Sequence, residues 1–161
     1  DIPLFEDEKG RIWQEEFRLT GRTVSVQQTA SHQGLREVKT GGAKVAERPT
    51  DADFEKAAVW TLGDLDRLSD NDLLQIDYQG DVARVYADGQ LVQDNQWNGN
   101  PMLVRVSDLK GKRAEIRILP LGKDYPVYLQ PDERKVLAGA PDGLLCQLKQ
   151  VLVIEHKQIQ K

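Results

Sequence analysis

Hydrophobic and polar residues alternate over several short stretches of this chain, most clearly between residues 73 and 106. Leu74, Ile76 and Tyr78 alternate with polar residues, which is the two-residue period of a strand with one buried face. The same period recurs over residues 83–87 and 114–118. We therefore predict that eight residues point into one core: Leu74, Ile76, Tyr78, Ala83, Val85, Val104, Ile116 and Ile118.

Turn signals separate these stretches. Gly80-Asp81 interrupts the first, and Asp88-Gly89 follows the second, where glycine tolerates the positive φ of a tight hairpin. A third short strand at residues 91–92 leaves this turn. The polar residues 94–101 then form a loop before Met102 returns the chain to the core. Residues 73–106 are therefore predicted to form a β-meander.

The rest of the chain shows further short strand patterns and little sign of helices. About nine or ten strand signals occur at short spacing, which is typical of an antiparallel sandwich. We expect one helical turn at residues 65–68, a long loop at 40–55 and an irregular or edge segment at 124–131. The prediction is an all-β antiparallel β-sandwich over residues 11–156, with an N-terminal arm or linker at 1–10 and a polar tail at 157–161.

Length and composition limit the class of protein. The 161 residues fit one domain and are too few for a TIM barrel, which takes about 250 residues. The net charge of −4 argues against a nucleic-acid-binding surface, and the apolar runs are far shorter than the roughly 20 residues of a membrane span. The chain starts at Asp1 with no signal-peptide pattern, so we interpret it as a piece of a longer protein.

Cys146 is the single cysteine, so the chain forms no internal disulfide. It lies in the apolar run Leu144-Leu145-Cys146-Gln147-Leu148. Reactive cysteines need a polar, electropositive setting. We therefore interpret Cys146 as a structural thiol.

Trp97 is the strongest candidate for ligand binding, because it lies in a polar loop beside Asp94 and Asn98. A flat ring packs against the C–H face of a sugar, while carboxylates and amides bind its hydroxyls. The sequence thus offers Trp97, Asp94 and Asn98 as a candidate carbohydrate site. The alternative is that Trp97 caps the edge of the sandwich or packs on a neighbouring domain.

Other chemistry has weaker support in the sequence. His32 and His156 lie far apart and have no cysteine or histidine at ligand spacing, so we predict no transition-metal site. Four aspartates offer oxygen ligands for calcium, but their spacing matches no EF-hand loop, and solvated turn residues are the preferred interpretation. These aspartates are Asp64, Asp66, Asp70 and Asp72. Nothing marks a pair of carboxyl groups for glycoside hydrolysis, so we predict no catalytic residues.

Two runs, GDVARVYADGQLVQDNQWNGNP at residues 80–101 and EIRILPLGKDYPVYL at residues 115–129, resemble a known family. They are similar to the C-terminal β-domains of bacterial β-galactosidases of glycoside hydrolase family 35. The resemblance implies a jelly-roll domain of the galactose-binding-like type, in which a structural calcium is common. It also implies a secreted or periplasmic parent enzyme. The catalytic barrel of that family and its two glutamates have no counterpart here.

Two functions follow as expectations. The first is a non-catalytic accessory domain that packs on the catalytic domain of the parent glycoside hydrolase and contacts galactoside or another carbohydrate. The second is an autonomous carbohydrate-binding module that uses the Trp97 loop. An exposed Trp97 favours the module, whereas a large apolar patch elsewhere favours the docking domain.

Overall fold

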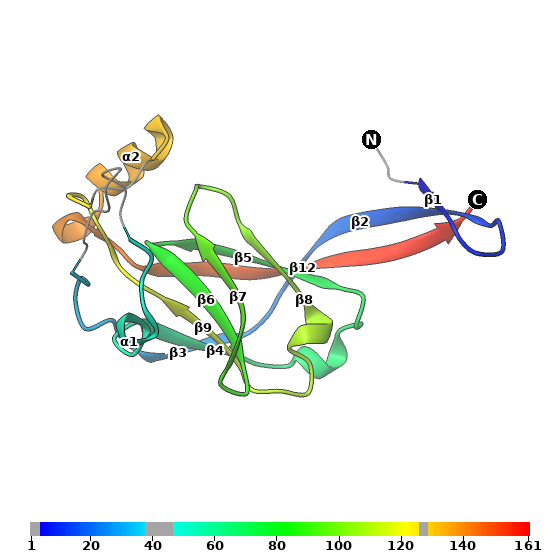
Figure 1. Cartoon of the computed structure of the whole chain (residues 1–161), viewed down its shortest axis with the longest axis horizontal. Helices are drawn as coiled ribbons and strands as arrows, with labels where there is room; N and C mark the ends of the chain where they lie inside the picture. The colour runs from blue at the N-terminus through cyan, green and yellow to red at the C-terminus, as the bar shows by residue number, and fades with distance from the viewer. Residues whose placement is uncertain (1–3, 38–46, 126–128) are drawn as a thin grey trace.

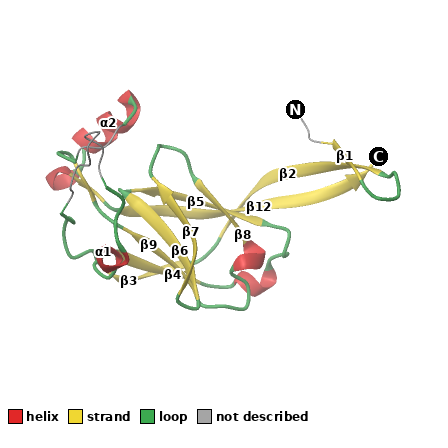
Figure 2. Ribbon diagram, viewed as in Figure 1, coloured by secondary structure: helices red, strands yellow, loops and turns green. Residues whose placement is uncertain are grey.

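Two antiparallel five-stranded sheets pack face to face in the computed structural model, which describes residues 4–37, 47–125 and 129–161 (Figure 1, Figure 2). The first sheet has the order β1 (Leu4–Glu6), β2 (Ile12–Thr23), β12 (Gln147–Gln160), β5 (Leu73–Gln79) and β8 (Met102–Arg105). The second has the order β3 (Val26–Ala30), β4 (Ala58–Leu62), β9 (Ala114–Ile118), β6 (Val82–Ala87) and β7 (Gln90–Gln96). A small separate sheet joins β10 (Leu121–Gly122) and β11 (Leu144–Leu145).

The core lies between the two large sheets, and it confirms the predicted inward positions. All eight residues predicted from alternation are at most 2% exposed. Leu74, Ile76 and Tyr78 come from the first sheet, whereas Val85 and Ile116 come from the second. The all-β sandwich is therefore confirmed, and its jelly-roll connectivity stays a prediction.

The predicted β-meander over residues 73–106 is wrong. β5 pairs with β8 and β12 in the first sheet, while β6 pairs with β7 and β9 in the second. The chain crosses between the sheets at Gly80, where a Cβ would lie 2.5 Å from Ile118 Cγ2 and 2.9 Å from the Leu119 carbonyl oxygen. Alternation shows which side of a strand is buried, but both sheets bury one side, so it does not show which sheet a strand joins.

Short helices lie in the connections between strands. The expected helical turn is present as the 3-10 helix η1 (Leu65–Arg67), and two further 3-10 helices are η2 (Val106–Asp108) and η3 (Pro141–Gly143). The described part of the predicted 40–55 loop contains α1 (Asp51–Phe54). The sequence interpretation missed α2 (Pro131–Ala138), which has a proline in its first turn. Glu133 Oε2 accepts the backbone N–H of Gln130 at the start of this helix. No described helix has the length and apolar character to cross a membrane.

β2 and β12 continue past the sandwich as a projecting ribbon, with β1 beside β2 at its tip (Figure 1). We define the projecting ribbon as residues 4–6, 12–19 and 154–160. The predicted N-terminal arm thus contains a strand, and residues 157–160 of the predicted tail are the end of β12. Residues 1–3 of the arm, and residues 40–46 and 126–128 of two predicted loops, lie outside the described residues.

Candidate functional site

Trp97 lies in the hydrophobic core and is 6% exposed. It follows β7, and its backbone N–H donates to the Asp81 carbonyl oxygen at 3.0 Å. Its neighbours Gln96 and Asn98 are exposed, so the one apolar residue of this segment takes the inward position. The expectation that Trp97 offers its ring to a sugar is therefore wrong, because a buried indole presents no open face.

The structure does not bring the other two predicted site residues together with the Trp97 ring. Asp94 is exposed on β7, opposite Arg84 of β6. Asn98 is exposed in the following loop, where its Oδ1 accepts the Asn100 N–H at 2.9 Å. Asp94 lines a polar cavity, whose other lining residues include neither Trp97 nor Asn98.

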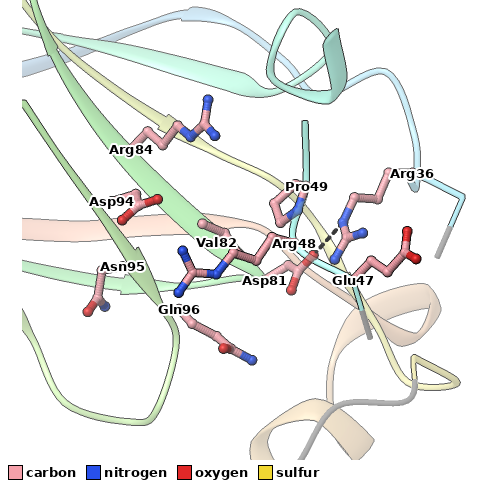
Figure 3. Close-up of a pocket in the computed structure, with 10 residues that line it drawn as sticks. All are labelled: Arg36, Glu47, Arg48, Pro49, Asp81, Val82, Arg84, Asp94, Asn95 and Gln96. Carbon is pink, nitrogen blue, oxygen red and sulfur yellow. Dashed lines mark hydrogen bonds and ion pairs between the residues drawn. The ribbon is translucent and has the colours of Figure 1, made fainter. Parts of the chain in front are cut away.

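A polar pocket of about 360 Å³ lies beside β6 and β7 (Figure 3). It combines three arginines with three acidic residues, so its formal charges balance. Its described lining residues include no aromatic ring. They are Arg36, Glu47, Arg48, Pro49, Asp81, Val82, Arg84, Asp94, Asn95 and Gln96.

A buried ion pair joins two lining residues of this pocket. Arg36 Nε donates to Asp81 Oδ2 at 2.9 Å, and their side chains are 6% and 2% exposed (Figure 3). Burial raises the pKa of the Asp81 carboxyl, and the Arg36 guanidinium opposes this increase. Tyr125 donates its hydroxyl to the Arg36 carbonyl oxygen at 2.9 Å. These contacts hold the segment around Arg36 against the sandwich.

Arg84 is tied to the wall of the pocket. Its Nη1 donates to Asp51 Oδ1 at 2.7 Å and to the Tyr86 hydroxyl at 3.2 Å. Its guanidinium lies 4.2 Å from the centre of the Phe54 ring and points away from Asp94 (Figure 3). Arg84 therefore shapes the pocket, whereas Asp94 faces it with no hydrogen bond to the described side chains.

The pocket can donate and accept hydrogen bonds, because its lining combines guanidinium, carboxyl and amide groups. No three His, Cys, Asp or Glu residues of the described ranges lie close enough to hold a metal. Of the four aspartates considered for calcium, Asp72 accepts the Ser69 N–H at 3.1 Å and Asp70 pairs with Lys110 at 3.3 Å. Burial raises the pKa of the Cys146 thiol to about 12, which keeps it protonated near neutral pH.

The two faces of the projecting ribbon differ in composition: one carries its aromatic residues, and the other carries the ion pairs of Glu155. In β12, Val153 points into the core, so Ile154 and His156 point to the outer side of the first sheet. Residues directly opposite each other in an antiparallel pair lie on the same face. The apolar and aromatic residues of the outer ribbon face, together with His156, are Phe5, Trp13, Phe17, Leu19 and Ile154, and the polar residues Glu15, Gln158 and Gln160 lie on the same face.

Solvent reaches much of this outer ribbon face. Phe5, Phe17 and Leu19 are 39%, 51% and 55% exposed, and the rings of Phe17 and His156 stack with centroids 4.4 Å apart. The opposite face carries Glu155, which pairs with Arg18 at 3.0 Å and with Lys157 at 2.7 Å. Near the tip it also carries three exposed apolar residues: Leu4, Ile12 and Ile159. The outer ribbon face continues the outer side of the sheet, so it is not an extension of the sandwich core.

Comparison with known proteins identifies no relative. No family model, no curated protein and no solved structure matches this chain.

Proposed function

We propose that this chain is a non-catalytic accessory domain, which docks on another folded part of a β-galactosidase-like glycoside hydrolase through its outer ribbon face. The observation that carries the proposal is the exposure of Phe5, Phe17 and Leu19 on the same face of the ribbon. Exposed apolar patches on folded domains mark interaction surfaces. The type of parent enzyme and the jelly-roll connectivity rest on the sequence resemblance alone.

The energetics of the ribbon also support docking. Beyond Ile154, β12 pairs with β2 and no longer with β5, and a two-stranded ribbon by itself is marginally stable in water. Covering the outer ribbon face would remove apolar surface from water, at about 25 cal/mol per Å². A partner would therefore stabilise the part of the fold that the sandwich does not support.

Docking can be tested by adding the remainder of the parent enzyme, expressed separately, to the 161-residue chain. A double variant, Phe17→Ser with Leu19→Ser, should weaken the complex at least about tenfold in calorimetric titration, which corresponds to about 1.4 kcal/mol. Leu91→Ser is the matched control, because Leu91 is 48% exposed on β7 of the other sheet. Equal affinities of the double variant and the control would refute docking through this face.

The charge-balanced polar pocket favours carbohydrate binding as a second candidate function, with Asp94 accepting hydrogen bonds from sugar hydroxyls and without Trp97. Titration of the isotope-labelled chain with galactose should shift the amides of residues 94–96 in nuclear magnetic resonance spectra. Asp94→Ala should abolish these shifts. Binding that is unchanged by Asp94→Ala would place the sugar elsewhere.

The non-catalytic assignment has its own test. We expect the isolated chain to leave aryl galactosides unhydrolysed, because the sequence contains no recognisable carboxylate pair. Turnover that survives thorough purification, and that disappears on substitution of one Asp or Glu of this chain, would contradict the proposal.

A further inference from the structure

β12 has a free edge along the projecting ribbon. β5 pairs with β12 only as far as the Leu73–Ile154 pair. From residue 155 to residue 160, β12 pairs with β2 on its other side. Among the described strands, none pairs with this part of β12 on the side where β5 ends.

The direction of the main-chain groups along this edge follows from two hydrogen bonds. The Val151 carbonyl oxygen accepts the Val24 N–H at 2.9 Å, and the Lys161 N–H donates to the Ile12 carbonyl oxygen at 2.8 Å. Both groups therefore point toward the β2 side of the sheet. The main-chain N–H and C=O of one strand residue point to the same side of the strand, and this side alternates from one residue to the next. The main-chain groups of the odd-numbered residues of this segment therefore point toward β2.

The main-chain N–H and C=O groups of the even-numbered residues therefore point toward the free edge. His156, Gln158 and Gln160 each offer one N–H donor and one C=O acceptor there, at a spacing of two residues. Such a row of unpaired main-chain groups is the template to which another strand adds.

A groove of about 730 Å³ runs beside this edge and leaves room for a strand. Residues 155–159 of β12 form one side of this edge groove. Its other lining residues are Arg22, Arg67, Ser69, Asn71 and Asp72.

The charges that remain available in the edge groove are positive. Glu155 is already paired with Arg18 and Lys157. Asp72 is 3% exposed and accepts the Ser69 N–H. Arg22 and Arg67 are exposed, and neither pairs with an acidic residue of the described ranges.

We infer that the free edge of β12 binds an extended polypeptide strand with acidic side chains, which runs antiparallel to β12 and in line with β5. Both β2 and β5 are antiparallel to β12, so the added strand would continue the hydrogen-bonding pattern of the first sheet. The inference rests on the proposed docking function, because it assigns the strand to the docking partner. It adds the type of segment that the partner supplies.

The test uses the isotope-labelled 161-residue chain and an acetylated heptapeptide of alternating threonine and glutamate. The peptide should shift the amide signals of His156, Gln158 and Gln160 most strongly in nuclear magnetic resonance spectra. A matched threonine–lysine peptide at the same concentration should shift them less, because Arg22 and Arg67 repel it. Absence of shifts with the acidic peptide, or equal shifts with both peptides, would overturn the inference.

Two variants test the geometry and the charge. Gln158→Pro removes an N–H that faces the free edge and leaves the bonds to β2 in place, so it should abolish binding, whereas Gln158→Ala should preserve it. Arg67→Glu should weaken binding about threefold, since exposed ion pairs contribute little. Circular dichroism verifies the fold of each variant. Binding that survives Gln158→Pro in a folded chain would show that no strand adds at this edge.

The same variants separate this inference from the proposed function. If Phe17→Ser with Leu19→Ser weakens docking and Gln158→Pro does not, the strand inference fails and docking through the outer ribbon face stands. If the acidic peptide binds the edge and the double variant still docks normally, the proposed face is wrong and the strand site stands as a peptide-binding edge.

Discussion

At the scale of single residues, the polarity of sequence neighbours did not show where Trp97 lies. Asp94, Gln96 and Asn98 surround it in the sequence and are exposed, yet Trp97 is 6% exposed. A polar composition predicts that a segment forms a loop. The burial of one side chain in that segment depends instead on the residues that it contacts across the sandwich. The alternative drawn from the sequence was that Trp97 caps the edge of the sandwich or packs on a neighbouring domain, and the structure instead places it in the core cluster.

Trp97→Ala should therefore destabilise the fold by about 3–5 kcal/mol, because removing a buried aromatic side chain leaves a cavity. Urea unfolding followed by circular dichroism measures the loss. Leu91→Ala is the control, since Leu91 is 48% exposed, and it should change stability by less than about 0.5 kcal/mol. A Trp97→Ala protein as stable as the control would mean that the indole is not a core side chain.

Two buried groups predict how stability depends on alkaline pH. Burial raises the pKa of Cys146 to about 12 and raises the pKa of Tyr78 above its ordinary value. In the unfolded chain these groups lose protons near pH 9 and 10, while the folded chain still holds them. The unfolded state is then favoured, so stability is full below about pH 9 and falls as the pH rises toward 12.

The measurement is the urea midpoint at about pH 8 and about pH 11. Cys146→Ala and Tyr78→Phe should each reduce the fall between these two pH values, because each removes one titrating group. Tyr78→Phe also removes the hydroxyl that donates to the Asn95 carbonyl oxygen at 2.8 Å, so its midpoint should be lower at both pH values. A fall as large as that of the wild type in both variants would assign the alkaline sensitivity to other groups.

At the scale of elements, the connection between β5 and β6 depends on close contact at Gly80. A Cβ there would meet Ile118 Cγ2 at 2.5 Å and the Leu119 carbonyl oxygen at 2.9 Å. Gly80→Ala should therefore destabilise the fold by about 1–3 kcal/mol through overpacking. Gly139→Ala is the matched control, because its Cβ would meet nothing closer than 3.6 Å. Equal melting temperatures of the two variants would show that the connection between β5 and β6 does not depend on close contact at Gly80.

Strand patterns were more informative than helix patterns at this scale. Alternation identified the core-facing side of β5, β6 and β9 correctly, although the other side of β6 and β9 is also largely buried. α2 buries only Glu133 and Leu137, so its sequence carries too few inward apolar residues for a helical period to be recognised. Pro131 at its first turn was the available signal.

At the scale of the whole molecule, the sandwich and the projecting ribbon differ in how well their amides should be protected. Residues 155–160 of β12 are half-buried or exposed, whereas four of the five residues of β9 are buried. In the isolated chain, amides of the ribbon should exchange with solvent faster than those of β9, because local opening costs less where few side chains are buried. His156, Gln158 and Gln160 should exchange fastest, since their N–H groups face the free edge.

Hydrogen exchange measured residue by residue by nuclear magnetic resonance tests this pattern. The comparison of odd-numbered and even-numbered residues within 155–160 is an internal control, because both lie at the same depth in the ribbon. Protection of the even-numbered amides equal to that of β9 in the isolated chain would contradict the free edge of β12.

The sequence by itself determined the all-β class and the inward side of the central strands, because alternation is local and a buried face imposes it at every second residue. Only the tertiary structure decided the rest. Pairing joins residues as far apart in the chain as Leu19 and Ile154, and a strand pattern does not specify its partner. The division of residues 73–106 between two sheets, the burial of Trp97 and the exposed outer ribbon face all follow from that pairing, since it determines which side chains meet others and which meet water.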